Sequence, residues 1–319
     1  MTDRPAPEGG REERGEAAPP SPSRPALWLG DRRGAAVDWT TQQWVKATGR
    51  RVDVAETPWL DGPTGEPSGI GEEFFEAWAA ANGLSVEEDL GAEAGGAARG
   101  LLPSLDALSG PGFDAGAVDA SVRDFYGRTS AYEVEAWAEW SGLFRPFGGL
   151  VATLFSRRLD QLNLPLGALD TSRGTTSRVL HLVRPGGGVA MAAWVRTLRA
   201  TGRSLYVGAY SAARVPGHPA PCVRVVFPLP NGACTVLLRP EVDEGGALRL
   251  VSSGAAWGDP GLYLNVHDGG RVWGRAVRSL RETIRVYAAR DGVRTDHTLR
   301  LGGRVFLRLH YRLTAPPAA

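Results

Sequence analysis

Four residues near the C-terminal end have side chains suited to binding or catalysis: Asp296, His297, Arg308 and His310. Aspartate and histidine exchange protons in acid–base chemistry, and arginine binds carboxylates and phosphates through its planar fork. They lie in two segments of alternating polarity joined at residues 301–303, a pattern that predicts a β-hairpin. Which of these side chains meet therefore depends on the register of the hairpin.

The hydrophobic pattern favours a three-residue loop for this hairpin. A two-residue loop at 302–303 would place the apolar row of 305–313 on one face with Asp296. Because a buried face sets the register of a strand, we expect the loop 301–303 instead. The pairs expected across the hairpin are Asp296 with Arg308, Arg294 with His310, Thr298 with Phe306 and His297 with Leu307.

The polar row of this hairpin has two interpretations. It can line the interior of a curled sheet, where Asp296, Arg308 and His310 would bind a carboxylate or phosphate, or it can be a solvated face. His297 falls on the apolar face, either as a site residue or as a structural histidine. We predict Asp296, His297, Arg308 and His310 as ligand-binding residues.

The segment Asp-Thr-Ser-Arg-Gly at 170–174 is a further candidate. Short polar side chains hydrogen-bond the backbone in turns and Gly174 tolerates a positive φ, so a corner between a helix and a strand explains all residues except one. The exception is Arg173. We predict that Arg173, with Arg158 or Arg178 nearby, meets an acidic ligand at the mouth of the sheet.

Signatures of the common enzyme classes are missing. The sequence has no Gly-x-Ser-x-Gly, no Gly-Lys phosphate loop, no paired-cysteine motif and no His-Glu-x-x-His. The five histidines are never within four residues of each other, so we expect no metal site and no cofactor. Basic and aromatic residues are not interleaved as in RNA-binding proteins, and we expect no nucleic acid partner.

Period-two segments dominate the chain after Arg178 and predict strands separated by Gly-, Pro- or Asn-containing turns. They occupy 177–183, 189–199, 204–212, 222–229, 233–239, 247–253, 261–267, 282–288, 293–301 and 305–313. Residues 272–284 fit a strand or a helix equally well. We expect an α+β fold, in which a helical N-terminal part precedes a mainly antiparallel, curled or barrel-like sheet of roughly eight to ten strands.

Helical patterns dominate the earlier part of the chain. Apolar spacing, N-cap residues and terminal glycines predict helices over 38–49, 68–83 and 114–127, a helix over 130–140 with a Ser130/Glu133 capping box, and a helix over 146–162 that packs across the sheet. We divide the chain into a disordered tail (1–26), an acidic helix and loop segment (27–112), a helical segment (113–165) and an antiparallel β domain (166–315).

Charge is distributed unevenly along the chain. Residues 1–120 hold 21 acidic and 10 basic residues, and residues 121–319 hold 14 acidic and 26 basic residues. The two parts can attract each other, or the basic part can bind an acidic ligand. All basic residues except Lys46 are arginine, which indicates genome composition as much as recognition.

Location and membrane topology follow from composition and cysteine use. The longest uncharged apolar run, Phe147–Phe155, is about half the ~18 residues needed to cross a bilayer, so no membrane span is expected. The first 26 residues lack the apolar core of a signal peptide. Cys222 and Cys234 flank a hairpin turn and lie roughly 20 Å apart along the strands, too far for a disulfide. We therefore expect a soluble, cytoplasmic protein.

A cavity-prone sheet, arginine-rich strand faces and missing catalytic signatures predict a carrier or binding protein for a small amphipathic or acidic ligand. Two other classes stay open. One is an enzyme that uses dispersed His, Asp and Arg residues, with His297 or His310 as the acid–base group. The other is an interaction or scaffold protein without a ligand. Oligomeric state, ligand identity and independent folding of the acidic part are not determined by the sequence.

Overall fold

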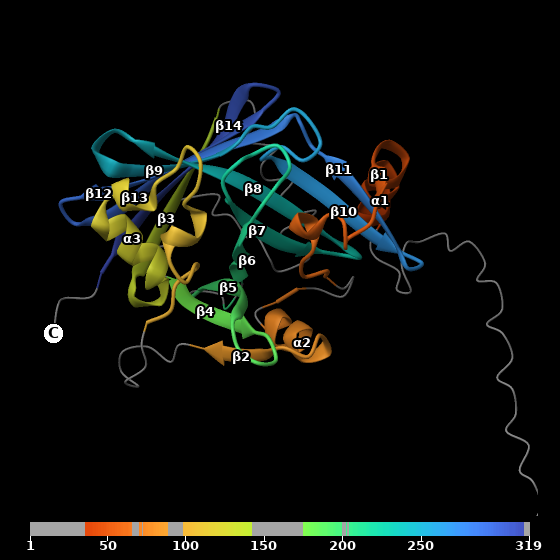
Figure 1. The fold of residues 1–319 in the computed structure, drawn as a ribbon, viewed down its shortest axis with the longest axis horizontal. Helices are drawn as coiled ribbons and strands as arrows, with labels where there is room; N and C mark the ends of the chain where they lie inside the picture. Colours follow the sequence, from red (N-terminus) through yellow and green to blue (C-terminus); the bar gives the residue numbers. More distant parts are fainter. Residues whose placement is uncertain are drawn as a thin grey trace, which may run out of the picture.

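The structure, a computed structural model, describes residues 36–65, 70–71, 73–88, 98–141, 175–199, 202 and 204–315. In this part of the chain three α-helices accompany one large antiparallel sheet (Figure 1). The α-helices are α1 (Ala36–Thr48), α2 (Phe74–Ala81) and α3 (Ala120–Gly127). The 3-10 helices are η1 (Pro58–Leu60), η3 (Leu105–Leu108), η4 (Ala115–Ala117), η5 (Thr129–Ala131) and η9 (Glu244–Gly246).

Fourteen strands make up the sheet. They are β1 (Arg50–Val52), β2 (Ser85–Glu88), β3 (Glu133–Trp140), β4 (Thr175–Val183), β5 (Val189–Leu198), β6 (Ser204–Ala213), β7 (Cys222–Leu229), β8 (Gly232–Asp243), β9 (Ala247–Ser252), β10 (Leu262–Asp268), β11 (Arg271–Ala276), β12 (Leu280–Ala289), β13 (Gly292–Leu301) and β14 (Arg304–Thr314).

The sheet follows the order β2-β4-β5-β6-β7-β8-β9-β12-β13-β14-β3 and forks at β8. The first part of β8 pairs with β10, which continues to β11 and β1, and its last part, Arg239–Asp243, pairs with β9. Most neighbours in this order are consecutive in the chain, because short turns connect antiparallel strands. The three margins are β1, β2 and β3, all supplied by the N-terminal part.

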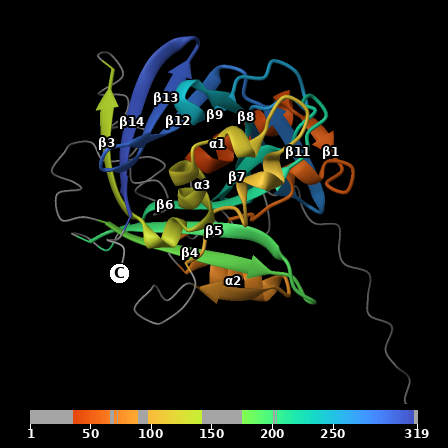
Figure 2. The same cartoon turned by 60° about the vertical axis from the view of Figure 1, so that its left-hand side comes forward.

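The two ends of the sheet curl toward each other. Figure 2 shows α3 between the side formed by β12, β13 and β14 and the side formed by β4 and β5. Where the sides approach, the Arg196 Nη2 in β5 donates a 3.1 Å hydrogen bond to the Val134 carbonyl oxygen in β3. The strand pairs of the described residues do not join β3 to β4, so the sheet is curled but not closed.

The main hydrophobic core lies on the concave side of this curl. From α3, Val122, Phe125 and Tyr126 are all at most 5% exposed. They meet inward-facing residues of the sheet: Val134, Val179, Ala192, Trp194, Val223, Val225, Val236, Leu238, Leu248, Leu250, Val286, Val293 and Leu313. These sheet residues alternate along their strands with residues of the convex face, as the pleat requires.

Ion pairs connect the acidic N-terminal part to the basic sheet. Arg178 of β4 contacts Glu88 of β2 (2.6 Å) and Glu76 of α2 (2.8 Å). Of the two interpretations of the uneven charge, attraction between the two parts is therefore observed.

The expected antiparallel sheet is confirmed, but roughly eight to ten strands understates its size. The ambiguous segment 272–284 contains β11 and the start of β12, and the N-terminal part supplies three strands in addition to its helices. The expected tail at 1–26, the helix over 146–162 and the segment 170–174 lie outside the described residues.

The helix predicted over 130–140 is wrong, because most of this segment forms β3. Along β3 the exposed residues Glu133, Glu135 and Trp137 alternate with the buried residues Val134 and Ala136. Its apolar residues fit a period of two as well as a helical period. Pairing with β14 decides between the two, since a strand buries these residues in the main core.

The predicted register of the last hairpin is also wrong. The loop is the two-residue turn Gly302-Gly303, and a β-bulge follows between Leu299 and Arg300 on one strand, so that Phe306 is the extra residue of the other. The bulge restores the match of apolar faces that led us to expect a three-residue loop. Asp296 consequently lies opposite His310, not Arg308.

Candidate functional site

Two of the predicted ligand-binding residues form a pair on the outer face of the curled sheet. The Nδ1 of His310 lies 2.7 Å from the Oδ1 of Asp296, and its Nε2 lies 3.8 Å from a carboxylate oxygen of Glu139. The indole ring of Trp137 stacks on the imidazole, with 5.7 Å between the ring centroids. The Asp296 side chain is 44% exposed, so this pair faces solvent.

The other predicted residues are dispersed. Arg308 is exposed on the same outer face, opposite Thr298 and Glu139. Arg173 lies outside the described residues. The structure therefore does not assemble the predicted residues into one site. Of the two interpretations of the polar row with Asp296, Arg308 and His310, it supports the solvated face.

His297 differs from these residues because it points into the curl. Its Nε2 lies 2.7 Å from the Oε2 of Glu282 in β12, and both side chains are less than 15% exposed. Glu282 lies on the same inward row as Ile284 and Val286. The pair is therefore a histidine and a carboxylate held together at the inner wall of the sheet.

The inner wall around this pair carries further polar side chains from three other strands. We call these side chains and the pair the interior polar cluster: Arg196 (β5), Tyr206 and Tyr210 (β6), Glu282 (β12), His297 (β13) and Tyr311 (β14). The side chains of Trp194, Phe227 and Cys234 adjoin it. The cluster thus combines a cation, a carboxylate, an imidazole and three phenols beside an aromatic surface.

Arg196 is the central charge of the cluster and is only 2% exposed. Its guanidinium carbon lies 5.4 Å from the Trp194 ring centroid and 5.9 Å from that of Tyr311. Burial lowers its pKa, an effect opposed by the phenolic groups of Tyr311, Tyr210 and Tyr206. Because arginine stays protonated in proteins, the interior holds a permanent positive charge.

The tyrosines of β6 form a second part of the cluster. The hydroxyl oxygens of Tyr206 and Tyr210 are 2.7 Å apart, and both rings pack near Trp194. Burial raises the pKa of both phenols well above the usual range, and the carboxylate of Glu282 adds to the rise. Burial likewise raises the pKa of Tyr311 to about 12.

Sequence reasoning missed five of the six residues of the interior polar cluster. A usable signal existed in two strands of the cluster, β5 and β6. Tyr206 and Tyr210 are four residues apart and so share a face of β6, and Arg196 interrupts an apolar strand on the face of Ala192 and Trp194. What the sequence did not contain was which strands meet across the concave side.

Two other buried polar side chains, those of Arg224 and His181, have structural partners. Arg224 donates to the carbonyl oxygens of Pro58 and Asp61, and thereby holds the segment around η1 against the sheet. The Nε2 of His181 lies 2.8 Å from the Gly100 carbonyl oxygen. In the described part of the chain, no group of three or more His, Cys, Asp and Glu side chains is arranged to hold a metal ion.

Comparison with known proteins gives one informative similarity. Over 247 residues, 77% of the chain, the sequence is 26% identical to "Uncharacterized membrane protein YndJ" of Bacillus subtilis (strain 168). The chain spans only 41% of the length of that protein. No protein-family model and no solved structure matches.

This similarity overturns our expectation of a soluble, cytoplasmic protein, since the protein that the chain resembles is a membrane protein. The expectation depended on sparse cysteines and on composition, and neither property determines where a protein works. Across the described ranges, every helix is too short or too polar to span a bilayer.

Proposed function

We propose that the interior of the curled sheet binds a small amphipathic or acidic molecule, and that the chain does so beside a membrane. The observation that carries the proposal is that the residues around Arg196 are enclosed by protein and yet keep accessible surface. The apolar part of the ligand would lie against Trp194 and Phe227.

Four side chains are surrounded by protein and still have solvent-accessible surface. Tyr206, Tyr210, Cys234 and Tyr311 pack against the main hydrophobic core, and burial raises the pKa of all four. All four are only partly buried by accessible area. The core residue Tyr126 provides the contrast, because burial raises its pKa too but it is only 5% exposed. Side chains with both properties are typical of the wall of a recess.

The polar groups suggest how such a ligand would be held. An acidic head would bind Arg196, because a charge-assisted hydrogen bond is strong where water is excluded. The phenols of Tyr206, Tyr210 and Tyr311 can donate or accept hydrogen bonds. Glu282 would accept a hydrogen bond from a hydroxyl or amine of the ligand.

The membrane setting is supported by the similarity to a membrane protein. A binding domain next to a bilayer has direct access to amphipathic molecules, which partition into lipid. The two parts of the proposal are separable, since a domain can bind such a molecule without contacting the membrane itself.

Binding of a fluorescent fatty acid tests the proposal directly. Dansyl-labelled undecanoic acid is titrated into the full chain without lipid, and energy transfer from tryptophan to the dansyl group reports binding. We expect saturable binding that Arg196→Gln weakens about tenfold or more, the contribution of a hydrogen bond to a charged group. Tyr311→Phe removes one hydroxyl and keeps the ring, and should weaken binding by a smaller factor.

The matched control is Arg304→Gln, which removes a charge from an exposed position on β14. Near-ultraviolet circular dichroism establishes that each variant keeps its tertiary structure. The proposal fails if the wild-type chain does not bind the probe, or if folded Arg196→Gln and Tyr311→Phe both bind it like the wild type.

The pair of Glu282 and His297 favours an enzyme as a second candidate. A histidine held 2.7 Å from a carboxylate can act as a general acid or base toward a ligand in the same interior. Mass spectrometry of molecules that co-purify with the wild type and with His297→Gln distinguishes the two. An enzyme should accumulate a different molecule in the variant, and a binding protein should retain the same one.

A further inference from the structure

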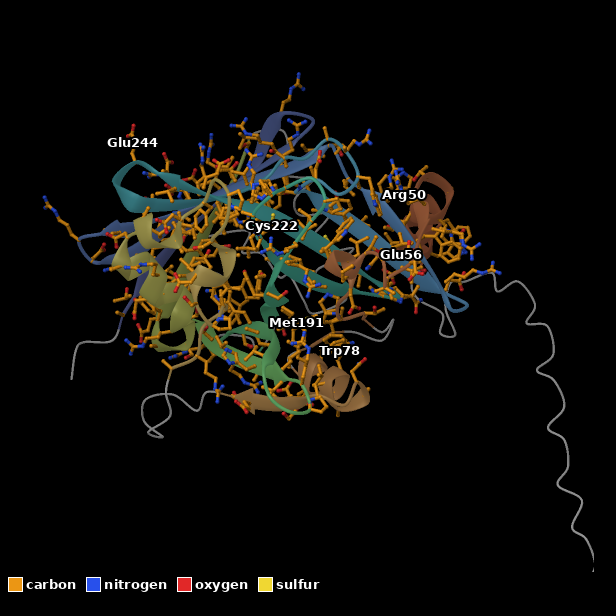
Figure 3. The ribbon with its side chains drawn as sticks, viewed as in Figure 1. Arg50, Glu56, Trp78, Met191, Cys222 and Glu244 are labelled. Atoms are coloured by element: carbon orange, nitrogen blue, oxygen red, sulfur yellow. The ribbon has the colours of Figure 1, made fainter. Side chains whose placement is uncertain are left out.

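Tryptophan and basic side chains gather where α1 packs on the branch of the sheet formed by β10, β11 and β1. The residues are Trp44 and Lys46 of α1, Arg51 of β1, and Arg271, Trp273 and Arg275 of β11; we call this set the basic–aromatic face. Figure 1 shows α1, β1 and β11 together at one end of the molecule, and Figure 3 labels Arg50 of β1 at the same end.

Strand pairing places the β1 and β11 residues of this set on one face. Arg51 pairs with Trp273, and Arg271, Trp273 and Arg275 alternate along β11, so their side chains point the same way. Helix α1 packs on this face through Val45, which contacts Val266, Leu264 and Trp273. The neighbouring residues Trp44 and Lys46 therefore border the face.

Contacts between cations and indole rings organise the basic–aromatic face. The Lys46 Nζ lies 4.8 Å from the Trp273 ring centroid and forms a 2.8 Å ion pair with Asp268. The Arg275 guanidinium carbon lies 4.2 Å from the Trp44 centroid, and its Nη1 donates to the Thr48 carbonyl oxygen. Trp44 is 41% exposed, and Arg51 and Arg271 are exposed.

We propose that the basic–aromatic face docks on a membrane surface that contains anionic lipids. This inference rests on the membrane setting proposed above and identifies the surface that makes the contact. Tryptophan prefers the level of lipid headgroups, where its ring is partly in hydrocarbon and its N–H is hydrated. Arginine and lysine bind lipid phosphates and are attracted to anionic bilayers.

Charge complementarity distinguishes lipid from other partners of this face. The face has four basic side chains, and one of them, Lys46, is paired with Asp268. Nucleic acid also carries phosphates, but single-stranded binding proteins stack bases on open aromatic faces. Here one face of each indole is covered by Arg275 or Lys46. The arrangement therefore favours lipid headgroups over nucleic acid, because headgroup phosphates bind to the cations and do not need an open aromatic face.

Vesicle co-sedimentation of the full chain tests this proposal. The vesicles contain phosphatidylcholine alone or an equal mixture of phosphatidylglycerol and phosphatidylcholine. We expect binding to the mixed vesicles, weakened about thirtyfold in Arg51→Gln/Arg271→Gln, since each basic residue near an anionic surface contributes roughly a factor of five. Trp44→Ser should weaken it further, and binding should fall as the salt concentration rises.

Arg281→Gln/Arg304→Gln is the matched control, because it removes two charges from exposed positions on β12 and β14. This control should bind the mixed vesicles like the wild type. Equal loss in both double variants, no difference between the two vesicle compositions, or no vesicle binding at all would overturn the proposal. The proposal would also fail if the chain bound single-stranded DNA more tightly than mixed vesicles and Arg51→Gln/Arg271→Gln abolished that DNA binding.

The dansyl-labelled fatty acid separates failure of this surface from failure of the proposed function. Arg51→Gln/Arg271→Gln should bind the probe in solution like the wild type, because the interior polar cluster is unchanged. Loss of vesicle binding with intact probe binding supports the docking surface, whereas a chain that binds the probe and never binds vesicles overturns the docking surface alone.

Discussion

At the scale of single residues, the tyrosines give the interior its character. The chain has seven, and the pKa of every one is raised, with burial as the main cause. A buried phenol stays neutral because the folded protein cannot solvate its anion. Three of the seven belong to the interior polar cluster, so their titration reports on the candidate site.

The tyrosines predict a delayed alkaline titration. The native chain should form little tyrosinate near pH 10, the ordinary phenol pKa, and much more toward pH 12, the value for Tyr263 and Tyr311. The pKa of these phenols is higher in the folded than in the unfolded chain, so the neutral phenols contribute to the stability of the fold. This contribution is complete below about pH 10 and is lost as the pH rises through the folded pKa. Tyrosinate absorbance, native and in denaturant, measures both curves. Superimposable curves would contradict the prediction.

Among the elements, the β13–β14 hairpin shows how a local detail sets a register. The apolar pattern correctly indicated which residues share a face, and therefore that His297 points inward. It did not reveal that a bulge at Phe306, and not a longer loop, produces this match. The bulge and the longer loop satisfy the same alternation, because each shifts the strand pairing by one residue.

The two-residue turn of this hairpin predicts a difference between substitutions. Gly302 and Gly303 have φ values of 57° and 85°, and no neighbouring atom would contact an added Cβ at either position. Gly303→Val should therefore destabilise the fold through backbone strain alone, by about 1–2 kcal/mol. Gly302→Asn should cost less, since asparagine tolerates this conformation in two-residue turns. Urea denaturation measures both, and equal costs would exclude strain as the cause.

For the whole molecule, the N-terminal part and the sheet form one structure. The strands at all three margins of the sheet come from the first 140 residues, and α3 packs against the concave side. Arg196 of β5 also connects the two parts, because it donates a hydrogen bond to the carbonyl oxygen of Val134 in β3. The arrangement implies that the concave side, and the site in it, depends on both parts of the chain.

Truncation of the α3 core residue Phe125 should test this dependence. Phe125 is 4% exposed, and its ring lies 6.5 Å from that of Trp194 on the opposite wall. We expect Phe125→Ala to lower the free energy of unfolding by about 3–5 kcal/mol, and Phe125→Leu by less. Val242→Ala, at a position that is 39% exposed, is the control and should change it by less than about 0.5 kcal/mol. Equal effects at Phe125 and Val242 would show that α3 is not part of the core.

By itself, the sequence determined the features that depend on neighbouring residues. Alternation and turn residues located the strands from β4 to β14 except β11, whose segment fitted a strand or a helix, and spacing with end signals located α1, α2 and α3. These patterns are readable because side-chain direction repeats every two or 3.6 residues. The inward direction of His297 followed from the same rule.

Only the tertiary structure decided features that depend on distant partners. The segment of β3 fits two periods, and pairing with β14 selected the strand. The interior polar cluster unites residues from five strands between positions 196 and 311, and no local pattern records which strands face each other across a curl. For the same reason the sequence left open whether the row with Asp296, Arg308 and His310 faces the interior or solvent, since alternation separates two faces without identifying which one the sheet encloses.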